Sequence, residues 1–167
     1  MSSSGSLKDL GKVVALGGGT GLPILLEALK PIKGEPNFEK ISAIVTVSDT
    51  GGSSGRLRRD LGTLAPGDIR NCLVALSNAP ELLRDLFRYR FSQGELQGHS
   101  FGNLFIVALA EVMGDFSKAI EKLHDILAIQ GQIFPSTKEN VELVAKFADG
   151  TSVKGDELIT QKRGKIV

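Results

Sequence analysis

The chain has 167 residues, a length that fits one domain with a sizeable buried core. Its net charge is +1, so no overall field attracts nucleic acid, and its one cysteine, Cys72, excludes a disulfide framework and an all-cysteine metal site. Residues 1–10 have no apolar signal-peptide core, and no apolar run approaches the roughly 20 residues of a membrane span. We therefore predict a mobile tail at residues 1–10 and a cytoplasmic protein.

Two predicted strands in the first third of the chain each enter a glycine-rich segment. Residues 12–16 form a short apolar strand before the glycines, and residues 22–29 follow as a helix. After a loop at 31–40, residues 41–47 are continuous in apolar and β-branched side chains, as in a buried parallel strand. Because parallel strands end at one edge of a sheet, both glycine segments should lie together there.

The rest of the chain is predicted to be helical and then hairpin-forming. Helical spacing and candidate caps (Asp68, Asn78, Ser100, and Asp115 or Ser117) predict helices at 56–61, 68–76, 80–91, 102–112 and 118–129. Residues 133–137 are extended, and 141–147 with 151–154 form a hairpin around Asp149-Gly150. The pattern predicts an α/β, Rossmann-like single domain over residues 11–167, with a mainly parallel sheet, helices on both faces and a β-hairpin near the C-terminus.

The first glycine segment, residues 17–21, exposes backbone N–H groups at a helix N-terminus, which favours an anion. Thr20 adds a hydroxyl donor. The segment lacks the Lys-Ser/Thr pair of a P-loop, and the third glycine of the dinucleotide fingerprint would fall at Leu22. Its functional interpretation is phosphate binding; the alternative is tight packing of strand against helix without a ligand.

The second glycine segment, residues 49–56, joins a carboxylate to glycines, hydroxyls and an arginine. Asp49 at a strand end could bind a ribose hydroxyl or a metal ion. The small residues allow close approach of backbone, and Arg56 can pair with phosphate in a bidentate manner. The alternative is a mobile linker.

Several further polar residues have weaker interpretations. Arg58 and Arg59 fit a solvated face, and Cys72 fits a buried, inert thiol. Arg70 and Asn71 could reach the crevice. His99 could act as a general acid or base or as a phosphate partner, whereas His124 fits a surface position on a helix.

Five ordered motifs resemble the YvcK-like gluconeogenesis factor family, which is related to the phospholactate transferase CofD. They are VVALGGGTGLP (13–23), TVSDTGGSSGRLRRDLG (46–62), PGDIRNCLVALS (66–77), YRF (89–91) and GHSFGNL (98–104). The resemblance implies a cytoplasmic role in bacterial growth on gluconeogenic carbon sources and in cell shape. It also implies binding of nucleotide sugars of the UDP-N-acetylglucosamine type.

In CofD relatives the same strand ends hold a nucleotide-linked donor, a deazaflavin acceptor and a divalent metal, so magnesium at Asp49 is a candidate cofactor here. Asp49 and His99 are the candidate catalytic residues. From the residues and the resemblance together, the predicted ligand-binding residues are Gly18, Gly19, Thr20, Gly21, Asp49, Thr50, Gly51, Gly52, Ser53, Ser54, Arg56, Asp68, Arg70, Asn71, His99, Ser100 and Asn103.

The chain departs from the family pattern in two ways. Many members read Asp-Asp before Gly-Gly, whereas this chain reads Asp49-Thr50, and one carboxylate fewer weakens a metal site. Family members are also much longer, so we expect a domain without the C-terminal half of the fold, or one that completes its sheet as a homo-oligomer.

Three functions remain open from the sequence. The first is a regulatory protein that binds a nucleotide sugar without chemistry. The second is a CofD-like transferase that moves a phospholactate-type group from a nucleotide-activated donor. The third is an NAD-dependent enzyme, which the imperfect fingerprint disfavours. No nucleic-acid partner and no membrane span are predicted.

Overall fold

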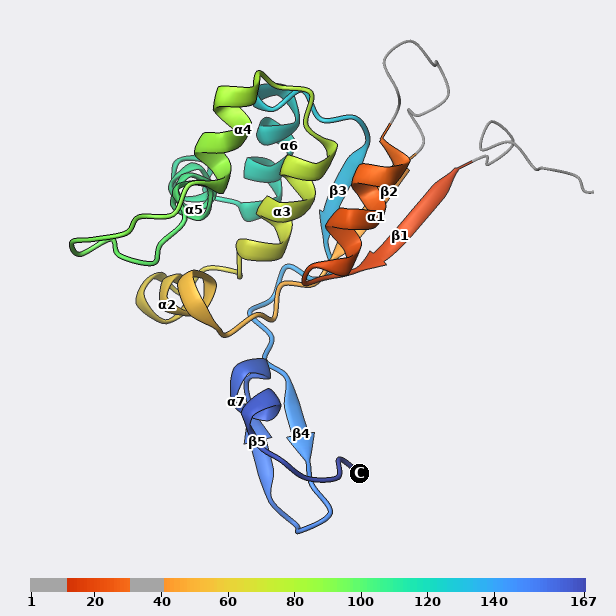
Figure 1. Ribbon diagram of the computed structural model, residues 1–167, viewed down its shortest axis with the longest axis vertical. Helices are drawn as coiled ribbons and strands as arrows, with labels where there is room; N and C mark the ends of the chain where they lie inside the picture. Colours follow the sequence, from red (N-terminus) through yellow and green to blue (C-terminus); the bar gives the residue numbers. More distant parts are fainter. Residues whose placement is uncertain (1–11, 31–40) are drawn as a thin grey trace, which may run out of the picture.

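The computed structural model describes residues 12–30 and 41–167 (Figure 1). The predicted tail at 1–10 and loop at 31–40 lie outside the described residues. None of the helices described is both long and apolar enough to cross a membrane. In chain order the elements are β1 (Val13–Gly17), α1 (Gly21–Leu29), β2 (Ile41–Val45), α2 (Gly52–Leu61), α3 (Gly67–Leu76), α4 (Glu81–Arg88), α5 (Phe101–Met113), α6 (Phe116–Ile126), β3 (Gln132–Pro135), β4 (Val144–Lys146), β5 (Ser152–Lys154) and α7 (Asp156–Gln161).

The main sheet has three parallel strands in the order β1-β2-β3. Ala15 pairs with Ala43, which pairs in turn with Ile133, and all three side chains are buried on one face. Apolar side chains of α1, α3 and α6 pack on this face and form the core with it. The predicted α/β class, the parallel sheet and the C-terminal hairpin are confirmed.

The opposite face of the sheet is not covered by any helix in the described part of the chain. There Leu16 is 71% exposed and Phe134 is 46% exposed. The expected helices on this second face are therefore missing from residues 12–30 and 41–167. The reason is topological: both crossovers move in the same direction across the sheet, and right-handed crossovers of that kind place their helices on one face.

Helix α2 begins at Gly52, four residues before the predicted start at residue 56. Glycine and serine are poor helix formers, so local propensity favoured a loop. Tertiary contacts make this segment helical, because Ser53 and Ser54 are buried and their hydroxyl oxygens accept hydrogen bonds from neighbouring helices. Most of a helix's stability in a protein comes from such packing rather than from propensity.

The predicted helix caps are only partly right. Asp115 caps α6, since its carboxylate accepts a hydrogen bond from Lys118 N at 2.8 Å. Asp68 is not an N-cap: Pro66 holds that position and Asp68 lies in the first turn of α3. Pro80 likewise holds the N-cap position of α4 in place of Asn78.

Strands β4 and β5 and helix α7 form a small C-terminal unit, which projects away from the main sheet and its helices (Figure 1). The strands pair in antiparallel fashion with Ala145 opposite Val153. Phe147 is buried within this unit and pairs across a bridge with Ile166. Helix α7 follows β5 immediately and was not predicted, because a six-residue helix carries almost no periodicity.

Replacement of Phe87 tests the core beneath α4 and α5. Its ring is fully buried, with its centroid 5.2 Å from that of Phe105. Phe87→Ala is expected to lower the free energy of unfolding by about 3–5 kcal/mol, measured by urea denaturation. Leu82→Ala on the same helix, where the side chain is 74% exposed, should change it by less than about 0.5 kcal/mol. Equal effects of the two substitutions would contradict the assigned packing of α4.

Candidate functional site

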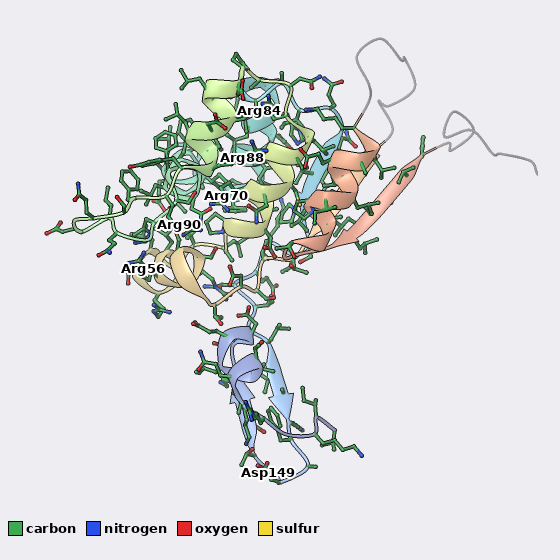
Figure 2. The ribbon with its side chains drawn as sticks, viewed as in Figure 1. Arg56, Arg70, Arg84, Arg88, Arg90 and Asp149 are labelled. Atoms are coloured by element: carbon green, nitrogen blue, oxygen red, sulfur yellow. The ribbon has the colours of Figure 1, made fainter. Side chains whose placement is uncertain are left out.

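A cavity of about 270 Å³ lies where the N-termini of α2, α3 and α5 meet, beyond the carboxyl end of β2. Figure 2 shows Arg70 and Arg90 in the region between α3 and α2. The structure thus brings many of the predicted residues together with two that were not predicted, Gly67 and Arg90. The cavity is lined by Asp49, Gly51, Gly52, Ser53, Ser54, Gly67, Asp68, Arg70, Asn71, Arg90 and Asn103.

The helix N-termini at this cavity favour an anion. Helices α2 and α5 have no side-chain cap. In α3, Gly67 N donates to Ser54 Oγ at 3.1 Å. The first N–H groups of an α-helix have no partner within the helix, and the helix dipole adds partial positive charge at the same end. Phosphate oxygens are well suited to such a place.

Ser53 is the centre of a buried hydrogen-bond cluster beside the cavity. Its Oγ accepts from Asn103 Nδ2 at 3.2 Å and from Ser100 N at 3.4 Å, and lies 3.1 Å from His99 Nδ1. Since two donors already point at this oxygen, the Ser53 hydroxyl must donate to His99 Nδ1. Burial lowers the pKa of His99, and nearby Arg56 acts in the same direction. The imidazole is therefore neutral at pH 7 with its proton on Nε2.

Asn103 supplies an acceptor that the protein does not use. Its side chain is 2% exposed, and its Oδ1 has no hydrogen-bond partner among the described residues. An unsatisfied buried oxygen costs free energy, so a ligand hydroxyl or amide that donates to it would be favoured.

Arg70 and Arg90 bring positive charge to the cavity. Burial lowers the pKa of Arg70, and the nearby Arg90 contributes to the same shift, yet a guanidinium stays charged. Arg70 Nη2 donates to Asn71 Oδ1 at 2.6 Å, and Arg90 donates to the Gly98 carbonyl. Two close cations of this kind attract an anionic ligand. The sequence signal for Arg90 was present in the YRF motif at 89–91, where the arginine itself was not singled out.

The first glycine segment contacts a carboxylate of the protein itself, and its predicted phosphate binding stays a prediction. Gly19 N donates to Asp68 Oδ2 at 2.8 Å, and Thr46 Oγ1 donates to the same oxygen at 3.2 Å. A Cβ on Gly18 would lie 1.9 Å from Thr46 Oγ1 and 2.6 Å from Asp68 Oδ2, so any other residue would force these two side chains to move. The anion at this loop is the protein's own carboxylate, and a ligand phosphate would have to displace it.

Other predicted residues lie outside the cavity. Arg56 points to a different loop, where its Nη2 donates to Gln97 O at 2.8 Å. Ser100 is fully buried and its Oγ donates to Phe87 O at 3.3 Å. His99 reaches the cavity only through Ser53. The predicted residues that do not line it are Gly18, Gly19, Thr20, Gly21, Thr50, Arg56, His99 and Ser100.

The residues present do not fit a divalent metal held by the protein alone. Asp49 Oδ1 accepts from Gly51 N at 2.9 Å. No group of three or more acidic, histidine or cysteine side chains suited to a metal occurs in residues 12–30 and 41–167. Hard cations want several oxygen ligands, so most would have to come from a bound ligand's phosphates. Magnesium at Asp49 stays a prediction.

A parallel sheet with helices packed on it and a cavity beyond its strand ends defines a Rossmann-like α/β domain. Residues 13–167 match the family model described as 2-phospho-L-lactate transferase CofD, and the chain therefore belongs to the CofD family. The resemblance seen in the sequence motifs is confirmed.

Named relatives share nearly all of this chain. A protein from Halalkalibacterium halodurans named gluconeogenesis factor is 44% identical over 92% of the chain and 47% of its own length. A protein from Aquifex aeolicus, which carries that name provisionally, is 56% identical over 93% of the chain and 48% of its own length. The chain thus spans about half the length of these curated relatives.

The fold also matches solved structures. A crystal structure of a Bacillus halodurans protein aligns with a TM-score of 0.85 and 43% identity over 94% of this chain and 50% of that one. A second crystal structure of the same protein, described there as a member of the UPF0052 family, aligns with a TM-score of 0.83 and 41% identity over 93% of this chain and 49% of that one.

The lowered pKa of His99 predicts a pH dependence of stability. A histidine whose folded pKa lies below its unfolded value stabilises the fold fully above the unfolded pKa, near 6.5, and this contribution is lost as the pH falls below it. The free energy of unfolding should therefore decrease from pH 7.5 to 5, measured by urea denaturation. His99→Gln should show a smaller decrease. Burial lowers the pKa of His124 as well, so His124 contributes to the same decrease in stability. The His124→Gln variant, measured in the same way, gives the size of that second contribution. An unchanged pH dependence in His99→Gln would contradict a buried, neutral His99.

Proposed function

We propose that this domain binds the diphosphate of a nucleotide sugar of the UDP-N-acetylglucosamine type, as part of a cytoplasmic regulatory protein of gluconeogenic growth and cell shape in bacteria. The observation that carries the proposal is the convergence of the uncapped N-termini of α2 and α5 with Arg70 and Arg90 on one cavity. Each of these features favours an anion, and together they favour one with several oxygens.

The size of the cavity suggests how such a ligand would lie. About 270 Å³ accommodates phosphate groups but not a whole nucleotide sugar. A groove of about 310 Å³ lies on the other side of Asn71, which lines both. Thr20, Pro23 and Ile24 contribute to the groove, which offers apolar surface for a base or sugar ring. In this arrangement the phosphates occupy the cavity and the rest of the ligand extends along α1.

The names of related proteins support the gluconeogenic part of the proposal. Relatives that are 44–56% identical carry the name gluconeogenesis factor. They are about twice as long as this chain.

A second candidate function is CofD-like transfer, favoured by the hydrogen bond from Ser53 to a neutral His99. In this alternative, Ser53 Oγ attacks a phosphorus atom of the nucleotide-activated donor while its proton passes to His99 Nδ1. The Oγ–P bond forms as the bridging P–O bond breaks, and the nucleotide leaves. A hydroxyl oxygen of the acceptor then attacks the same phosphorus and releases its own proton, the Oγ–P bond breaks, and Ser53 Oγ takes back the proton held by His99. The donors from Asn103 and Ser100 would stabilise charge on Oγ during attack.

Ligand binding can be measured by thermal unfolding with UDP-N-acetylglucosamine. At about 100 times its Kd, a ligand adds about 2.7 kcal/mol to the native state and raises Tm by several degrees. Arg90→Ala should weaken binding about tenfold or more, because a charge-assisted hydrogen bond to phosphate is lost. Arg163→Ala removes the same charge at an exposed position near the C-terminus and should bind as the unaltered protein does. No shift in the unaltered protein, or equal binding by Arg90→Ala, would refute the assigned cavity.

The transferase alternative predicts a covalent intermediate. Incubation with a nucleotide-activated phospholactate donor should add the mass of the transferred group to the chain, detected by mass spectrometry and located at Ser53. Ser53→Ala should remain unmodified, and His99→Gln should react more slowly. Binding of the donor without any mass increase would rule out transfer through Ser53 and leave the regulatory function.

A further inference from the structure

Polar contacts attach the C-terminal unit to the body of the domain. Figure 1 shows α7 as the part of this unit next to α2. Arg58 of α2 makes one junction: its Nη2 donates to Asn140 Oδ1 and to Val141 O at 2.7 Å, while its Nη1 donates to Asp49 O at 3.2 Å. One guanidinium therefore holds the entry to β4 against the segment that leaves β2.

A second junction involves Asp156 at the start of α7. Its Oδ1 accepts from Thr50 N at 2.7 Å and from Thr50 Oγ1 at 2.5 Å. The next amide, Gly51 N, donates to Asp49 Oδ1. Consecutive amides of the loop between β2 and α2 are thus held by carboxylates, one local and one 106 residues further along the chain.

The approach of α7 to this loop depends on Gly155. The backbone φ of Gly155 is 86°, a value that residues with a side chain rarely adopt. A Cβ at this position would also lie 2.8 Å from Thr50 Oγ1. On the same side, Glu157 Oε2 lies 3.7 Å from the place where a Cβ on Gly51 would be. The N-terminus of α7 therefore packs directly on the backbone of residues 50–51.

The charge of Asp156 strengthens this contact. Burial of Asp156 opposes ionisation, but hydrogen bonds from the Thr50 side chain and backbone outweigh it and lower the pKa of Asp156. The carboxylate is therefore ionised at neutral pH, and hydrogen bonds to an ionised acceptor are stronger than neutral ones.

We propose that α7 is a clasp that positions the loop at residues 49–52, with Asp156 as its positioning residue. Asp156 does not line the cavity; it acts through Thr50 on Gly51 and Gly52, which do. The affinity of the cavity for an anionic ligand then depends on the C-terminal unit. Because coupling between two sites is reciprocal, a bound ligand also stabilises the attachment of α7. The affinity part of this inference rests on the proposed function.

The test compares three variants with the unaltered protein. Asp156→Ala removes the acceptor, and Asp156→Asn keeps an oxygen that can accept from Thr50 without the charge. Asp149→Asn removes one negative charge from the same unit at the tip of the hairpin, at the end of the unit that points away from the main sheet (Figure 2). Kd for UDP-N-acetylglucosamine and for inorganic pyrophosphate is measured by calorimetry. Hydrogen exchange is measured at the amides of residues 50–53 and 156–161, with and without each probe.

We expect Asp156→Ala to raise Kd about tenfold, Asp156→Asn to recover part of this loss, and Asp149→Asn to leave Kd unchanged. Exchange at Thr50 and Gly51 should accelerate in Asp156→Ala without ligand, and either probe should slow exchange in α7 of the unaltered protein. A purely structural contact would not produce that last effect.

The outcomes separate the clasp from the proposed function. If the unaltered protein binds a probe and Asp156→Ala binds it equally well, the clasp is refuted and the proposed function stands. If neither probe binds the unaltered protein, the proposed function and the affinity part of the clasp are both refuted. In either case, unchanged exchange at Thr50 in Asp156→Ala overturns the positioning of the loop by α7.

Discussion

Two adjacent hydroxyls, those of Ser53 and Ser54, hold three helix N-termini at one place. Ser53 Oγ accepts from residues at the start of α5, and Ser54 Oγ accepts from the first amide of α3. Both serines belong to the first turn of α2 and are buried. Glycine and serine are poor helix formers, so without these bonds the start of α2 would not be stable as a helix. The cavity between the helices would then lose its shape.

The same arrangement gathers partial and full charges around one cavity. Helix N-termini that converge carry partial positive charges, and Arg70 and Arg90 add full positive charges beside them. Asp49 and Asp68 line the same cavity and offset the charges of the two arginines, and each carboxylate accepts hydrogen bonds from its own surroundings. The N–H groups of the helix N-termini and the guanidinium groups are the donors that suit phosphate oxygens, and they are the physical link between the fold and the function proposed for it.

Sequence reasoning found the second glycine segment and much of its surroundings, because strand-end position and residue type are local properties. It did not predict the contact of the first glycine segment with Asp68, since nothing in the sequence brings Asp68 to Gly19 across 49 residues. It also overlooked Arg90, whose place at the cavity depends on the path of the chain from α4 to α5. The hydrogen bond between Thr50 and Asp156 could not be predicted from the sequence either, because it joins residues 106 positions apart.

The sequence by itself determined the α/β class, the parallel pairing, the family and the edge of the sheet where the candidate site residues gather. Hydrophobic periodicity and glycine spacing act over a few residues, so they can be read directly from the chain. The tertiary structure alone decided which glycines face the cavity, where α2 begins and which face of the sheet is covered. Those outcomes depend on contacts between residues distant in sequence, and there packing and buried hydrogen bonds outweigh local propensity.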